Sequence, residues 1–133
     1  MAQFQSYRDL IAWQKAMDLA GITYDLADKL PRREMFGMTS QLRNASSSIP
    51  ANIAEGHGRL HTGDFRRHLS IALGSLAEAE TFMLLAVRRR YLTDAEIKPV
   101  WDLAQEVGRL IRGLARSLES REGVGTRRTK SSL

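Results

Sequence analysis

The stretch Phe36-Gly-Met-Thr-Ser-Gln-Leu-Arg-Asn-Ala-Ser-Ser-Ser-Ile-Pro-Ala-Asn-Ile-Ala-Glu-Gly-His-Gly-Arg59 decides the fold. Its apolar residues recur every three or four positions, which is the spacing of one helix face: Met38, Leu42, Ala45, Ile49 and Ile53. Pro50 interrupts this stripe without shifting its phase. Proline removes a backbone donor and crowds the carbonyl of Ser46, so the pattern favours one helix that is kinked at Pro50. The alternative is two short helices, with Pro50 at the start of the second. Gly56 and Gly58 end the helix in either case.

Three more amphipathic stretches accompany this helix. Residues 65–86 carry one apolar stripe, and residues 100–118 carry two that interleave. The second of these two is buried either against another subunit or inside its own bundle. Residues 10–27 carry a heptad stripe, formed by Leu10, Trp13, Met17, Ala20, Tyr24 and Ala27. Thr93 and Glu96 have capping-box spacing and mark the start of the last helix, while Pro99 delays or bends it. We therefore predict an all-α, up-and-down antiparallel four-helix bundle over residues 1–118.

Length and composition narrow the class of protein. A chain of 133 residues is expected to form a single domain, and the absence of cysteine excludes disulfides and thiolate metal sites. No apolar run approaches the roughly 20 residues of a membrane span. We expect a cytoplasmic protein without membrane contact. Residues 119–133 consist mostly of glycine, serine, threonine and arginine, which predicts a disordered basic tail.

The chain carries a formal charge of +5, and sixteen of its twenty basic residues are arginine. The guanidinium fork binds phosphate oxygens in pairs, so this bias favours a nucleic-acid partner, although a GC-rich genome also produces it. Arg109, Arg112 and Arg116 are spaced to lie on one ridge of the last helix. The full set of candidate nucleic-acid-binding residues is Arg66, Arg67, Arg88, Arg89, Arg90, Arg109, Arg112, Arg116, Arg121, Arg127, Arg128 and Lys130.

No catalytic motif is evident. The sequence contains neither a Gly-x-x-x-x-Gly-Lys phosphate loop nor a Gly-x-Ser-x-Gly nucleophile turn. It also lacks the Glu-x-x-His pairs of di-iron bundles. His57 and His61 are four residues apart among glycines, and His68 adjoins a core stripe, so we expect none of them to bind a metal. The sequence predicts neither an enzyme nor a cofactor.

Four segments together resemble a known family: residues 7–16, residues 36–43, the signature Ser48-Ile-Pro-Ala-Asn-Ile-Ala-Glu-Gly56, and residues 71–78. They are similar to the bacterial four-helix-bundle proteins encoded in intervening sequences of large-subunit ribosomal RNA genes. The resemblance covers residues 7 to 118. That family is similar in fold to the accessory variability determinant proteins of diversity-generating retroelements, which form pentameric barrels, bind nucleic acid and partner a reverse transcriptase.

The resemblance implies a homo-oligomer, with five subunits in a ring, that uses a basic surface to bind the backbone of RNA or DNA without sequence preference. A protein-interaction adaptor, such as an accessory subunit of a reverse transcriptase, is the alternative. The signature residues are expected to serve the fold. They are Ile49, Pro50, Asn52, Glu55, Gly56 and Arg59.

Overall fold

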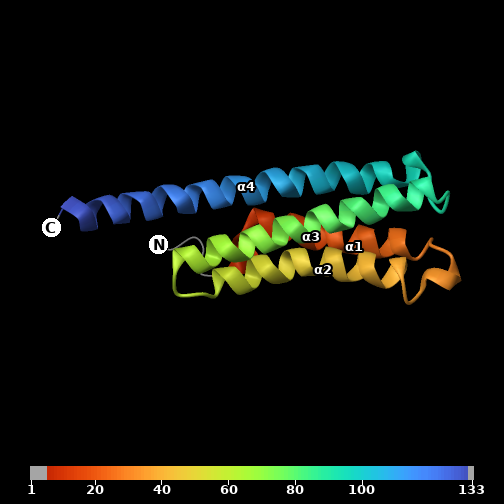
Figure 1. The fold of residues 1–133 in the computed structure, drawn as a ribbon, viewed down its shortest axis with the longest axis horizontal. Helices are drawn as coiled ribbons and strands as arrows, with labels where there is room; N and C mark the ends of the chain where they lie inside the picture. The colour runs from red at the N-terminus through yellow and green to blue at the C-terminus, as the bar shows by residue number, and fades with distance from the viewer. Residues whose placement is uncertain (1–5, 132–133) are drawn as a thin grey trace.

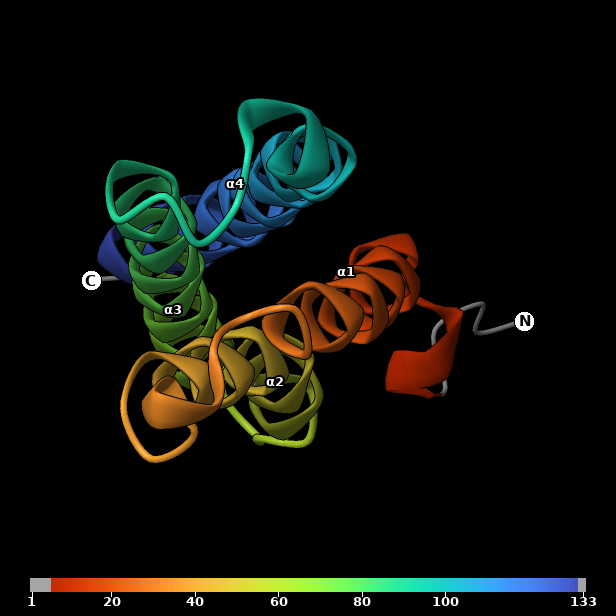
Figure 2. The same cartoon turned by 90° about the vertical axis from the view of Figure 1, so that its right-hand side faces the viewer.

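The computed structural model describes the backbone of residues 6–131 and the side chains of residues 6–120. It contains four long helices and two short 3-10 turns: η1 (Tyr7–Asp9), α1 (Ile11–Ala27), η2 (Arg32–Glu34), α2 (Met38–His57), α3 (Thr62–Arg88) and α4 (Asp94–Ser131). Successive helices run antiparallel, and contacts between α1 and α4 close the bundle (Figure 1 and Figure 2). The predicted all-α four-helix bundle is confirmed.

The stretch from Met38 to His57 forms a single helix with Pro50 inside it, and the two-helix alternative is therefore wrong. All five members of its apolar stripe are buried. The hydroxyl of the buried Ser46 donates to the carbonyl of Arg43 at 3.0 Å, which gives this polar group a partner beside the proline. The kink itself stays a prediction.

The predicted buried face of α1 is wrong for most of its length. Met17 and Tyr24 are 47% and 41% exposed, and Trp13 is half-buried. The buried face lies beside the predicted one. The buried residues of α1 are Ala12, Ala16, Leu19, Thr23, Leu26 and Ala27, of which Ala27 alone belongs to the predicted stripe. Small residues at a helix contact allow the backbones to approach closely. The larger apolar residues consequently flank the contact and lie toward α2.

Helix α4 begins at the predicted capping box and contains Pro99, so the alternative of a start delayed by Pro99 is wrong. The Thr93 N–H donates to Glu96 Oε1 at 2.9 Å, and the Glu96 N–H donates to Thr93 Oγ1 at 3.1 Å, which completes the capping box. The bundle buries residues of both predicted stripes: Ala104, Ile111 and Leu118 from one, and Val100 and Val107 from the other. Their apolar neighbours Trp101, Leu103, Leu110 and Leu114 are half-buried. Its own bundle thus covers the centre of α4 and leaves the two flanks partly open.

Beyond Leu118 the structure differs from the expected loss of regular structure, because the helical backbone of α4 continues to Ser131. This extension projects past the ends of the other three helices (Figure 1). A helix extends at low cost from turns that have already formed, even where no neighbour packs on it. The division into a bundle and a tail stays a prediction.

Helix α3 is long and apolar enough to cross a membrane by length and composition alone. The central helix of a bundle has the same properties. In this structure, the α3 stripe from Leu69 to Ala86 is buried against the other helices.

Candidate nucleic-acid interface

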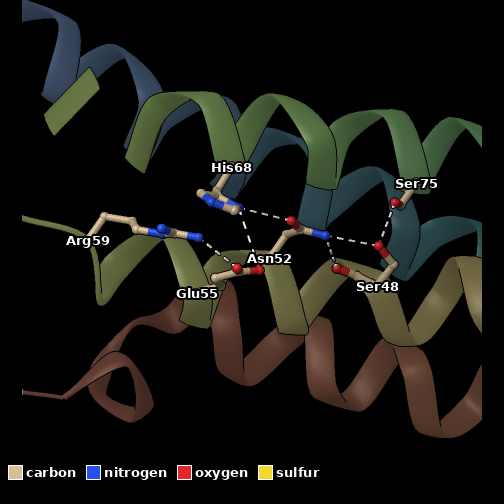
Figure 3. Close-up of polar contacts among 6 residues, drawn as sticks. All are labelled: Ser48, Asn52, Glu55, Arg59, His68 and Ser75. Carbon is tan, nitrogen blue, oxygen red and sulfur yellow. Dashed lines mark hydrogen bonds and ion pairs between the residues drawn. The ribbon is translucent and has the colours of Figure 1, made fainter. Parts of the chain in front are cut away.

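The signature segment contributes to a line of polar contacts between α2 and α3, which we term the polar chain (Figure 3). It consists of Ser48, Asn52, Glu55, Arg59, His68 and Ser75. At its centre, the Asn52 amide nitrogen donates to the Ser48 carbonyl at 2.9 Å and to Ser48 Oγ at 3.0 Å. Ser48 Oγ in turn lies 2.8 Å from Ser75 Oγ. The half-buried side chains of Ser48, Asn52 and Ser75 thereby have hydrogen-bond partners within the α2–α3 contact.

Toward the end of α2, the polar chain continues through His68, which is 5% exposed. His68 Nδ1 lies 3.1 Å from Asn52 Oδ1 and 3.9 Å from Glu55 Oε2. Arg59 donates to Glu55 Oε1 at 2.8 Å. His68 Nε2 is buried without a hydrogen-bond partner among the described residues. These contacts fix helix register, because each polar group has its partner only in one alignment of α2 and α3.

The remaining signature residues pack between the helices. Ile49, Pro50 and Gly56 are buried. A Cβ on Gly56 would lie 2.7 Å from His68 Cβ and 2.9 Å from Phe65 Cδ1, so only glycine permits this approach of α2 to α3. This geometry supports the expectation that the signature serves the fold.

The three ridge arginines, Arg109, Arg112 and Arg116, are all exposed. Within residues 6–120, none of them takes part in an ion pair. The preceding acidic residues have other partners, since Asp102 pairs with Lys98 at 3.0 Å and Glu106 pairs with Lys15 at 3.7 Å. The ridge therefore keeps its positive charge.

The other candidate arginines divide between the two ends of the bundle. Arg66 and Arg67 lie in the first turns of α3, whereas Arg88 ends that helix. At 1.5 Å per residue the two groups are about 30 Å apart. Gln105 bonds to Glu80, and Gly108 lies against Leu76. These contacts align α4 antiparallel to α3, so the ridge lies nearer to the end of α3 that contains Arg66 and Arg67 than to the end that contains Arg88.

The structure leaves part of the predicted set undescribed. The side chains of Arg121, Arg127, Arg128 and Lys130 lie outside the described residues, although their backbone belongs to α4. Their predicted role in binding stays a prediction.

Sequence reasoning missed Arg32 and Arg33. Both are exposed in η2, at the same end of the bundle as the exposed Arg88, Arg89 and Arg90, because the α1–α2 and α3–α4 connections lie at that end (Figure 2). The signal was available: an up-and-down bundle places its first and third connections together. The pair Arg32-Arg33 could have been assigned to the same end as Arg88 to Arg90.

An apolar groove between α1 and α2 was also missed. It is lined by Tyr7, Trp13, Met17, Tyr24, Pro50 and Ala54, among others. The large apolar residues of the predicted α1 stripe line this groove. An open apolar surface of this kind marks a site of interaction more often than a featureless surface.

The described part of the chain contains no candidate metal site. Within residues 6–120, no group of three or more histidine, aspartate or glutamate side chains is arranged to hold a metal ion. His57 stacks edge-on against Phe65, with ring centroids 5.8 Å apart. The absence of a cofactor stays a prediction.

Comparison with known proteins gives the family. The model of the 23S rRNA-intervening sequence protein family matches residues 8–113. The chain belongs to this family. No curated protein matches it. Among solved structures, the chain is similar to a protein of unknown function from the S23 ribosomal protein family of Bacteroides thetaiotaomicron, with a TM-score of 0.73 and 25% sequence identity. The match covers 79% of this chain and 98% of the other. The resemblance inferred from the signature is thus confirmed.

Proposed function

We propose that this protein is a non-enzymatic, cytoplasmic, homo-oligomeric nucleic-acid-binding protein that holds the phosphate backbone through exposed arginines. The observation that carries the proposal is the α4 ridge, where Arg109, Arg112 and Arg116 are exposed and unpaired within the described side chains. Three guanidinium groups on one helix face can contact successive phosphates. A family associated by name with 23S rRNA is consistent with an RNA partner.

The binding is expected to have little sequence preference. Phosphate contacts position a protein on its polymer without reading bases. Candidate contacts from the tail are Arg121, Arg127, Arg128 and Lys130. They follow the ridge in the sequence, and their positive charge adds to the electrostatic attraction.

Self-association is the second half of the proposal. The apolar groove between α1 and α2 and the half-buried flank of α4 offer apolar surface that a second copy of the chain can cover. The assignment of five subunits rests on the resemblance to the accessory variability determinant proteins.

One test addresses both halves. Light scattering on the purified protein should give a particle several times heavier than the 15.0 kDa chain, and fluorescence anisotropy should show binding to labelled RNA or DNA. Reversal of the ridge charges by Arg109→Glu, Arg112→Glu and Arg116→Glu should strongly weaken this binding. Arg8→Glu makes the same type of change at an exposed site off the ridge and should have little effect. Tight binding that survives the triple reversal would exclude the ridge as the site.

The α1–α2 groove also favours a second candidate function, a protein-interaction adaptor such as the accessory subunit of a reverse transcriptase. Its aromatic lining suits an apolar helix of a partner. A reverse transcriptase gene beside this one would support the adaptor, whereas a location inside a ribosomal RNA operon would oppose it. Met17→Glu should then prevent partner binding and spare RNA binding.

A further inference from the structure

One end of the bundle brings two connections of the chain into direct contact. The Tyr91 hydroxyl, which follows α3, donates to Glu34 Oε2 in η2 at 3.0 Å. Glu34 Oε1 accepts the Met38 N–H at 3.2 Å. These hydrogen bonds, together with the positive charges of Arg33 and Arg89, hold the pKa of Glu34 below its ordinary value. The carboxylate therefore stays ionised and ties the two connections together.

Five exposed arginines belong to the two connections that meet here, and we term them the basic end: Arg32, Arg33, Arg88, Arg89 and Arg90. The guanidinium carbons of Arg33 and Arg89 lie 5.3 Å and 5.8 Å from the Tyr91 ring centroid. Cation–π contacts of this length hold the two forks beside the ring. Within residues 6–120, no ion pair involves any of the five. Their donors remain available to phosphate oxygens.

Two apolar side chains of the α1–α2 connection are exposed to solvent. Phe36 is 93% exposed and Met35 is 45% exposed. Phe36 is an exposed phenyl ring three residues after Arg33 in the chain. Sites that bind single strands combine exposed aromatic rings, on which bases stack, with arginines that hold the backbone. A duplex keeps its bases stacked inside and presents none to Phe36.

Arg90 adds a separate observation, because its φ is 61° and it is the only non-glycine residue with positive φ in the described chain. The Tyr91 N–H bonds to the Ala86 carbonyl and the Arg90 N–H to the Val87 carbonyl, both at 2.9 Å. This is a Schellman motif with Arg90 at the position that glycine occupies most cheaply. Strain of this kind concentrates at functional sites.

We propose that the basic end binds single-stranded nucleic acid, with the five arginines on the phosphates and Phe36 stacked on a base. This inference rests on the proposed nucleic-acid function and adds a second site, at the opposite end from Arg66 and Arg67. The polymer spans the α1–α2 and α3–α4 connections.

The arginine contribution is tested with Arg32→Gln combined with Arg88→Gln, since neither side chain contacts Tyr91 or Glu34 in a described interaction. Affinity for a labelled single-stranded RNA should fall about tenfold, and the negative slope of log affinity against log salt should become shallower by about 0.7 per lost contact. Arg8→Gln is the matched control at an exposed site elsewhere and should leave both quantities unchanged.

The stacking contribution is tested with Phe36→Ala and its control Leu60→Ala, a residue 96% exposed in the α2–α3 connection at the other end of the bundle. Phe36→Ala should weaken single-stranded RNA binding about tenfold and leave affinity for inorganic polyphosphate, which has no bases, unchanged. Leu60→Ala should alter neither. Arg90→Gly should raise the melting temperature yet weaken RNA binding, which separates a binding role from a structural one.

The outcomes distinguish the two proposals. If the basic-end variants bind single-stranded RNA like the wild type while the ridge reversal abolishes binding, the basic end is not a site and the proposed function stands. If the wild type binds neither single strands nor duplexes, both proposals fail. Equal losses for single-stranded RNA and polyphosphate in Phe36→Ala would overturn the stacking of a base.

Discussion

The contact of Gly56 with α3 makes a sharp prediction for Gly56→Ala. The new methyl group would lie 2.7 Å from His68 Cβ, 2.9 Å from Phe65 Cδ1 and 3.3 Å from the Phe65 carbonyl oxygen. A Cβ atom cannot rotate away, because it is bonded directly to the backbone. The two helices must therefore separate by several tenths of an ångström, which also strains the 3.1 Å contact between Asn52 and His68.

Two opposing effects set the size of the change. Overpacking a well-filled contact costs about 1–3 kcal/mol. Alanine in place of glycine in a helix recovers up to about 1 kcal/mol, and less here because Gly56 lies one residue from the end of α2. We expect a net loss of about 1–2 kcal/mol in the free energy of unfolding, which combines these two terms.

Urea denaturation followed by circular dichroism measures this change. Gly74→Ala is the matched control, because Gly74 is exposed in the middle of α3 and no atom lies within 4 Å of an added Cβ. It should stabilise the protein by roughly 0.5–1 kcal/mol. A Gly56→Ala protein as stable as Gly74→Ala would show that α2 and α3 do not approach as described.

Three further predictions concern other parts of the molecule. Asn52→Ala removes the partner of His68 Nδ1 in a site where Nε2 already has none, and should destabilise the fold by about 1–3 kcal/mol in urea titrations. Glu34 has a pKa lowered from 4.5 by hydrogen bonds to its ionised form, so its stabilising effect is complete above that pH and is lost as the pH falls through the folded-state pKa. The stability difference between wild type and Glu34→Gln should therefore shrink between pH 7 and acid pH; a difference independent of pH would refute the role of the carboxylate. Backbone amides of residues 119–131 should exchange with solvent far faster than those of Leu69 to Ala86, as hydrogen exchange can show, because α4 projects past the ends of the other three helices. Equal protection would mean that an interface covers it.

Most of the fold could be predicted because the residue spacing and capping signals within each helix agree with the way the helices pack. The α2 stripe from Met38 to Ile53 keeps its phase across Pro50, and the structure buries all of it in one helix. The Thr93–Glu96 capping box likewise fixes the start of α4 through contacts three residues apart.

The face of α1 could not be predicted because hydrophobicity does not distinguish a core from a groove. Trp13, Met17 and Tyr24 form a regular stripe, yet the bundle selects the smaller residues Ala12 and Ala16 for its close contact. That choice depends on the interhelical distance, which only the packed structure supplies.

The sequence could predict the part of the candidate interface that lies on one helix. It could not predict the parts whose residues come from several segments of the chain. The spacing of Arg109, Arg112 and Arg116 is enough to place them on one ridge. The basic end depends on the long-range hydrogen bond between Tyr91 and Glu34, whose partners are far apart in the chain. The polar chain similarly needs His68 of α3 to complete the contacts of Asn52.

The salt dependence of binding to single-stranded RNA tests the central claim most directly. If exposed arginines hold the phosphate backbone, log affinity should fall linearly with log salt, with a slope of about −0.7 for each phosphate contacted. Replacing the three ridge arginines should make this slope shallower by about 2. Binding whose affinity does not change with salt, or no binding at low salt, would contradict the account.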